Sequence, residues 1–81
     1  MTTSQAKPIS ISVGFQWRNA AGKVWVVTGT RPGGVCEIYR VGRAVSGETY
    51  TRLIRDGIAA GTVIPMELTD EARAILRRCN A

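Results

Sequence analysis

Hydrophobic and polar residues alternate one by one near the start of the chain. The apolar positions of this run are Ile9, Ile11, Val13, Phe15 and Trp17. A period of two is typical of a half-buried β-strand, and Gly14 predicts a bend or bulge within it. Residues 19–22 predict a hairpin loop. Further strands are expected over residues 23–31 and 35–41, joined by the Arg-Pro-Gly-Gly turn, so this half of the chain predicts an antiparallel meander.

After residue 45 the spacing of apolar residues changes from two to that of a helix. The apolar positions are then Tyr50, Leu53, Ile54 and Ile58. They predict a helix that Ser46 or Thr49 caps and Gly61 ends. Gly57 lowers the stability of the helix in its middle by roughly 1 kcal/mol relative to alanine. The segment therefore forms either one helix or two short pieces. A short strand over residues 62–64 should stop at Pro65.

The C-terminal segment carries the clearest helical pattern. Its apolar stripe consists of Leu68, Ala72, Ile75, Leu76 and Cys79. Thr69 is a suitable N-cap residue, and Asp70 with Glu71 would lie in the first turn, where the helix dipole favours anions. Arg77 and Arg78 would lie in the last turn, where cations are favoured. The pattern predicts an amphipathic helix that needs a surface to pack on.

The strand alternation also predicts which side chains share a face of the sheet. If a bulge at Gly22 places Trp17 opposite Trp25, one face carries Phe15, Trp17, Trp25, Val27, Cys36 and Ile38. The other face then carries Val24, Val26, Tyr39 and Val41. Since both faces are apolar, both should be covered. Either the sheet curls into a small barrel with a helix on its outside, which we favour, or a second copy of the chain covers one face.

These features together predict an α+β fold. It consists of a curled antiparallel β-meander, one or two short helices and a C-terminal amphipathic helix. The short strands and tight turns over residues 9–65 resemble an SH3-like small barrel in architecture. We expect a flexible N-terminus over residues 1–8 and a single small domain over residues 9–81.

Composition restricts the chemistry that the domain can perform. The chain has 81 residues and no histidine, which excludes an imidazole base, a Ser-His or Cys-His pair and a histidine metal ligand. The glycines form no phosphate-loop motif and are typical of turns. Cys36 lies in a predicted strand and is interpreted as a small core residue without an activating base. We therefore expect a non-catalytic protein with no metal and no cofactor.

No apolar run approaches the ~20 residues of a membrane span, and the polar N-terminus does not have the pattern of a secretory signal. A cytoplasmic location is therefore expected, with Cys36 and Cys79 as free thiols in a reducing compartment.

The distribution of charge is the most informative feature for function. The chain carries a net charge of +5, from eleven basic and six acidic residues. Residues 7–55 hold eight basic and two acidic side chains, a net +6, whereas residues 56–81 hold three and four, a net −1. A concentrated positive surface is typical of polyanion binding. The predicted phosphate contacts are Arg18, Lys23, Arg31, Arg43, Arg52 and Arg55, and Tyr39 is the candidate for stacking on a base.

The leading hypothesis is thus a nucleic-acid-binding module that uses Arg-rich loops and the sheet surface. The alternative is a protein-interaction module whose arginines face an acidic protein surface, such as a phage- or plasmid-encoded inhibitor that docks on a host or defence complex. A homodimer is a third hypothesis, because a second copy could cover the second apolar face. Arginines that only keep a small domain soluble are the remaining interpretation.

Overall fold

The computed structural model describes residues 10–79, which form five β-strands and two α-helices. The elements, in chain order, are β1 (Gln16–Asn19), β2 (Val24–Arg31), β3 (Val35–Arg40), β4 (Ser46–Tyr50), α1 (Thr51–Ala60), β5 (Val63–Met66) and α2 (Asp70–Cys79). All neighbouring strands are antiparallel and follow the order β4-β3-β2-β1-β5. The expected flexible segment 1–8 lies outside the described residues.

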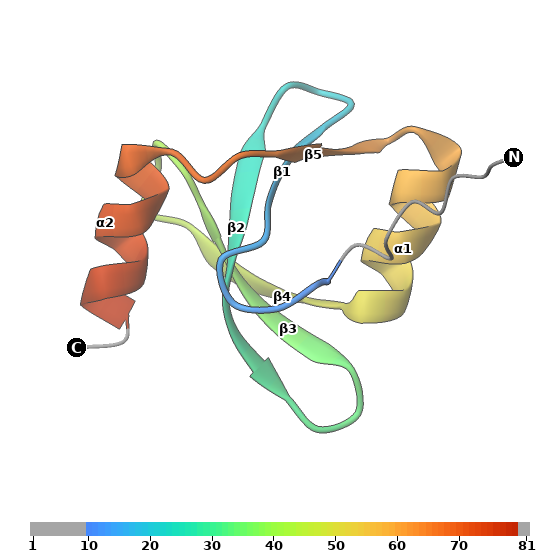
Figure 1. The fold of residues 1–81 in the computed structure, drawn as a ribbon, viewed down its shortest axis with the longest axis horizontal. Coiled ribbons are helices and arrows are strands. Elements are labelled where there is room, and N and C mark those ends of the chain that lie inside the picture. Colours follow the sequence, from blue (N-terminus) through green and yellow to red (C-terminus); the bar gives the residue numbers. More distant parts are fainter. Residues whose placement is uncertain (1–9, 80–81) are drawn as a thin grey trace, which may run out of the picture.

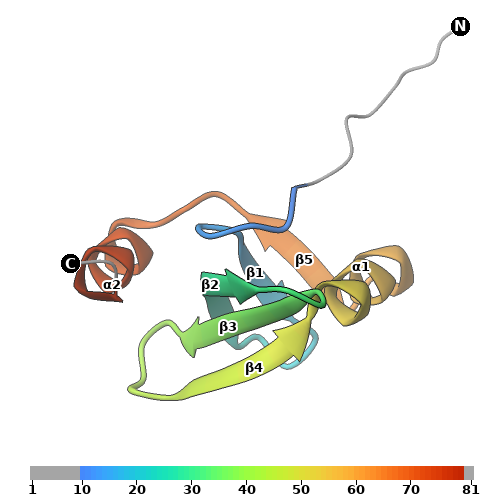
Figure 2. The ribbon, with the colours of Figure 1, turned by 90° about the horizontal axis from the view of Figure 1, so that it is seen from below.

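The sheet curls into a half-barrel, and the two helices lie on different sides of it (Figures 1 and 2). Helix α1 connects β4 to β5, which are the two edges of the sheet, and α2 packs on the other face. This arrangement confirms the predicted α+β class and the small barrel-like fold with a C-terminal amphipathic helix. Within residues 10–79, neither helix is long and apolar enough to cross a membrane.

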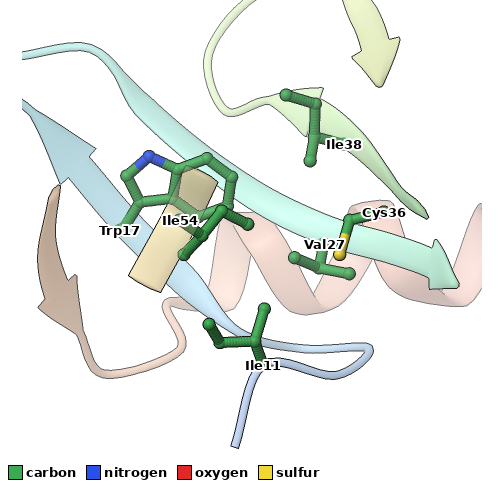
Figure 3. Packing of buried hydrophobic residues seen from close by; sticks show 6 residues of the cluster. All are labelled: Ile11, Trp17, Val27, Cys36, Ile38 and Ile54. Carbon is green, nitrogen blue, oxygen red and sulfur yellow. The ribbon is translucent and has the colours of Figure 1, made fainter. Parts of the chain in front are cut away.

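The inner face of the half-barrel holds the larger core (Figure 3). Its buried side chains are Ile11, Trp17, Val27, Cys36, Ile38 and Ile54. The predicted register is confirmed, because Trp17 pairs with Trp25 and Val27 pairs with Ile38. The ring of Phe15 stacks on that of Trp17, with 5.7 Å between the ring centroids. Alternation alone was therefore enough to assign this face of the sheet.

The outer face holds a second, smaller core beneath α2. Val26, Ala72 and Ile75 are buried there, and Tyr39, Val41, Leu68 and Leu76 pack against them. The apolar stripe of α2 thus covers the second apolar face of the sheet within the same chain. A second copy of the chain is not needed to cover this face, which removes the observation that motivated the homodimer hypothesis.

The first strand is shorter than the alternation predicted. Strand β1 begins at Gln16, and the residues before it turn, with Gly14 at φ +98° and a hydrogen bond from the Phe15 N–H to the Ser12 carbonyl. Ile11 reaches the core from this turn, whereas Val13 is exposed. A non-helical turn can therefore preserve an alternating pattern without belonging to the sheet.

The segment 46–50 was predicted wrongly as the start of a helix. It forms β4, which pairs along its whole length with β3. Helix α1 begins only at Thr51, and its N-cap residue Tyr50 has extended backbone angles and makes no side-chain capping bond. Neither Ser46 nor Thr49 caps the helix. The ladder with β3 satisfies the backbone groups that face β3, so tertiary pairing outweighs the weak local preference of this segment.

Of the two alternatives for α1 the single helix is observed, and one expectation next to it is corrected. The helix runs through Gly57 without a break, and a methyl group at that position would lie 2.4 Å from Cγ2 of Val63. Gly57 therefore lets the helix approach β5 closely. Pro65 does not stop the last strand, because β5 continues to Met66 with Pro65 opposite Trp17. Strand β5 is an edge strand, where proline is tolerated. Gly61 ends α1 at φ +81°, as predicted.

Candidate nucleic-acid interface

The N-terminus of α2 is fixed to the sheet by a buried glutamine. The side chain of Gln16 in β1 is almost fully buried, and its Oε1 accepts a hydrogen bond of 2.9 Å from the backbone N–H of Thr69. Thr69 is the predicted N-cap residue, and its Oγ1 accepts a bond of 3.3 Å from the Ala72 N–H. These bonds position the helix on the outer face, so that α2 runs beside the β3–β4 loop from its first turn to its last.

A groove of about 660 Å³ lies between α2 and the β3–β4 loop, residues 41–45. We call it the α2 groove. The lining side chains that are buried or half-buried are Tyr39, Ala74 and Ile75. The charged side chains of its lining are exposed, and they are Arg43, Glu71, Arg77 and Arg78. An apolar and aromatic interior with charged groups around it is suited to binding a ligand that combines charge with flat or apolar parts.

The electrostatic balance of the α2 groove is positive. Three guanidinium groups line it, against one carboxylate, that of Glu71. Among the described residues, Arg43, Arg77 and Arg78 form no ion pair, whereas Arg31 and Arg73 do. The three charges of the groove are therefore available to an external anion.

The structure disperses most of the basic residues that the sequence singled out. Arg18 lies in β1 and Lys23 in the adjoining hairpin loop, at the end of the sheet where β1 and β2 connect. Arg52 and Arg55 lie on α1, across the sheet from α2 (Figure 1). Of the seven predicted site residues, Tyr39 and Arg43 are the two brought together in the α2 groove.

Arg31 has partners of its own. Its guanidinium forms a hydrogen bond and ion pair with the carboxylate of Glu48, and its Nη1 lies 3.6 Å from Oε2 of Glu37. All three side chains come from neighbouring strands on the outer face of the sheet. Because two carboxylates face one guanidinium, this cluster has no positive excess with which to attract a phosphate.

Sequence reasoning did not assign Arg77 and Arg78 to the site. They were interpreted only as partners of the dipole at the end of α2. Both lie on the same flank of the helix as Ala74, three and four residues away, and this spacing could have placed them on one surface. The alternation of the strands contained no information on which loop would face that surface.

Comparison with protein-family models, with curated proteins and with solved structures finds no match for this chain. Within residues 10–79, the structure brings together no group of three or more cysteine and carboxylate side chains that could hold a metal ion. The side chains of the α2 groove supply guanidinium groups that can donate hydrogen bonds to an anion, and a tyrosine ring that can contact a flat group.

Proposed function

We propose that this protein is a small non-catalytic module that binds nucleic acid through the α2 groove. The observation that carries the proposal is the meeting of Arg43, Arg77 and Arg78 around Tyr39, without ion-pair partners among the described residues. Phosphates along a strand recur at short intervals, so a row of guanidinium groups can bind several of them while an aromatic side chain contacts a base. A cytoplasmic location fits the free thiols of Cys36 and Cys79.

The structure leads us to divide the basic residues into three groups. In the proposal, Arg43, Arg77 and Arg78 bind phosphates, and the exposed side chains Arg18, Lys23 and Arg52 add a weak, distributed attraction. Arg31 is left out because Glu37 and Glu48 neutralise it. The curled sheet is a small barrel-like fold, and small barrels commonly present loops and a sheet face to their ligands.

The test is a binding titration by fluorescence anisotropy with single-stranded DNA, single-stranded RNA and duplex DNA. The groove variant carries Arg43→Ala, Arg77→Ala and Arg78→Ala. The matched control carries Arg18→Ala, Lys23→Ala and Arg52→Ala, which remove the same charge from elsewhere on the surface. A hydrogen bond contributes about 1 kcal/mol net, and more where it is charge-assisted, so loss of all three arginines should weaken binding about 100-fold or worse.

The control variant should lose less than about fivefold, because exposed charges more than about 8–10 Å from the ligand are screened at physiological salt. Equal losses in the two variants would mean that net charge alone binds nucleic acid and would reject the groove. Poly-glutamate serves as a competing ligand. If it binds the groove and no nucleic acid does at low salt, an acidic protein surface replaces nucleic acid as the partner.

A further inference from the structure

The two edges of the sheet differ in how they are protected against pairing with another strand. Edge strands present unpaired backbone groups, and proteins commonly block them with proline, bulges or charges. Strand β5 contains Pro65, which has no N–H to donate. Strand β4 contains no proline, and its antiparallel pairing with β3 continues without a bulge over all five of its residues. Figure 2 shows β4 along the open margin of the sheet.

The hydrogen bonds at the two ends of β4 establish which of its backbone groups point outward. The Arg40 N–H donates to the Val45 carbonyl, and the Thr51 N–H donates to the Gly34 carbonyl, both at 2.8 Å. In an antiparallel ladder, alternate residues bond to the neighbouring strand. Odd-numbered residues of this segment therefore bond to β3. The N–H groups of Ser46, Glu48 and Tyr50 point away from the sheet, as do the carbonyls of Ser46 and Glu48.

The side chains of β4 leave this edge accessible to another strand and give it a local negative charge. Ser46 and Gly47 are small and exposed, so they do not obstruct an incoming strand. The carboxylate of Glu48 is held beside Arg31, and Glu37 lies on the other side of the same guanidinium, which leaves the cluster with one net negative charge. An incoming strand would place a side chain directly opposite Glu48, and a basic residue there is favoured.

The far end of the edge is apolar. Tyr50 and Leu53 lie three residues apart where β4 passes into α1, and about half of each side chain is exposed. Large exposed apolar side chains next to unpaired strand backbone are typical of sites that bind extended peptides. The partner strand should therefore carry an apolar residue near the position that faces Tyr50.

A second copy of the chain fits this edge poorly. Two copies related by a two-fold axis could pair along the whole of β4 through their outward N–H groups. In that antiparallel register Glu48 lies directly opposite Glu48 of the other copy. Like charges in such a cross-strand position are destabilising.

We propose that β4 is a docking strand to which an extended, basic segment of another protein adds as a sixth strand. This surface adjoins the α2 groove, because Cys79 at the end of α2 lines a second pocket with Ser46, Gly47 and Glu48. It goes beyond nucleic-acid binding, because the sheet edge is formed by β4 and none of the arginines that line the groove belongs to β4. Backbone hydrogen bonds would provide the affinity, and Glu48 with Tyr50 would select the sequence of the segment.

The test uses a displayed library of short random peptides selected on the full chain, followed by titration of the enriched peptides. Peptides should be enriched that alternate apolar and polar residues, with Lys or Arg opposite Glu48. Glu48→Pro removes the central outward N–H and should weaken binding about tenfold or more, since each 1.4 kcal/mol corresponds to tenfold in affinity. Glu48→Gln keeps that N–H and should bind the peptides while losing the preference for Lys or Arg.

Nucleic-acid binding by Glu48→Pro should be retained, which confirms its fold, and should match that of Glu48→Gln, because both variants remove the carboxylate that pairs with Arg31. If Glu48→Pro does not fold, peptides N-methylated at alternate amides provide the same test on the unaltered protein and should not bind. Three results would overturn the proposal: no enriched peptides, enriched peptides that bind Glu48→Pro as well as the unaltered chain, or a dimer in sedimentation that Glu48→Pro dissociates, which would make a second copy the occupant.

Discussion

Gly57→Ala is a sharp test of how closely α1 approaches β5. In an exposed helix the change would stabilise the protein by about 1 kcal/mol through helix propensity. Here the added methyl would lie 2.4 Å from Cγ2 and 3.2 Å from Cβ of Val63, and 3.1 Å from Oγ1 of Thr62. Rotation of the Val63 side chain relieves the first contact but not the second. Overpacking of this kind costs about 1–3 kcal/mol, which outweighs or cancels the gain from propensity, so we expect a net destabilisation of about 0–2 kcal/mol.

The assay is urea denaturation followed by tryptophan fluorescence, with Ala59→Gly and Val63→Ala as reference variants. Ala59 is exposed on the same helix, so Ala59→Gly measures the local propensity, with an expected cost of about 1 kcal/mol. In the double variant Gly57→Ala/Val63→Ala the two changes should compensate each other in part, because alanine at position 63 has no Cγ2 but keeps Cβ, and we expect a coupling of about 1 kcal/mol. A Gly57→Ala protein that is more stable than the unaltered chain would refute the close approach.

Three further predictions follow from the packing and the ion pairs. Gln16→Leu leaves the Thr69 N–H without its acceptor and should destabilise the protein by about 1–3 kcal/mol in the same assay, with faster amide exchange in α2; unchanged exchange would contradict the anchoring role. Under native conditions one thiol per chain should react rapidly with Ellman's reagent, because Cys79 is exposed and Cys36 is buried; rapid reaction of both would contradict the core. Arg31→Ala should change stability by less than about 1 kcal/mol and leave nucleic-acid affinity within about twofold, whereas a large loss of affinity would restore Arg31 to the interface.

The sheet register was predictable because large apolar side chains make it clear which strand residues face the core. The two tryptophans pair across β1 and β2, and only one phase of the strands puts both of them in a core. The C-terminal helix was predictable for the same reason, since a long apolar stripe and a threonine cap agree with each other. Both features depend on local patterns that tertiary contacts reinforce.

The sequence did not predict features whose local pattern is weak and whose structure is determined by tertiary contacts. Residues 46–50 contain small and polar side chains with no apolar alternation, so their pairing with β3 left no trace in the sequence. Gly57 looked like a helix breaker because its packing partner Val63 is reached only after the chain turns at Gly61. The α2 groove was hidden for a related reason: it joins Arg43 to a helix that begins only at Asp70.

The most direct test of the proposed function is the dependence of duplex DNA affinity on salt. The logarithm of the binding constant falls with the logarithm of salt concentration by about 0.9 for each phosphate contact. Loss of Arg43, Arg77 and Arg78 should therefore make the slope shallower by about 2.7, whereas loss of Arg18, Lys23 and Arg52 should change it by less than about 1. A groove variant that keeps the slope of the unaltered protein would contradict the assignment of the α2 groove as the phosphate-binding site.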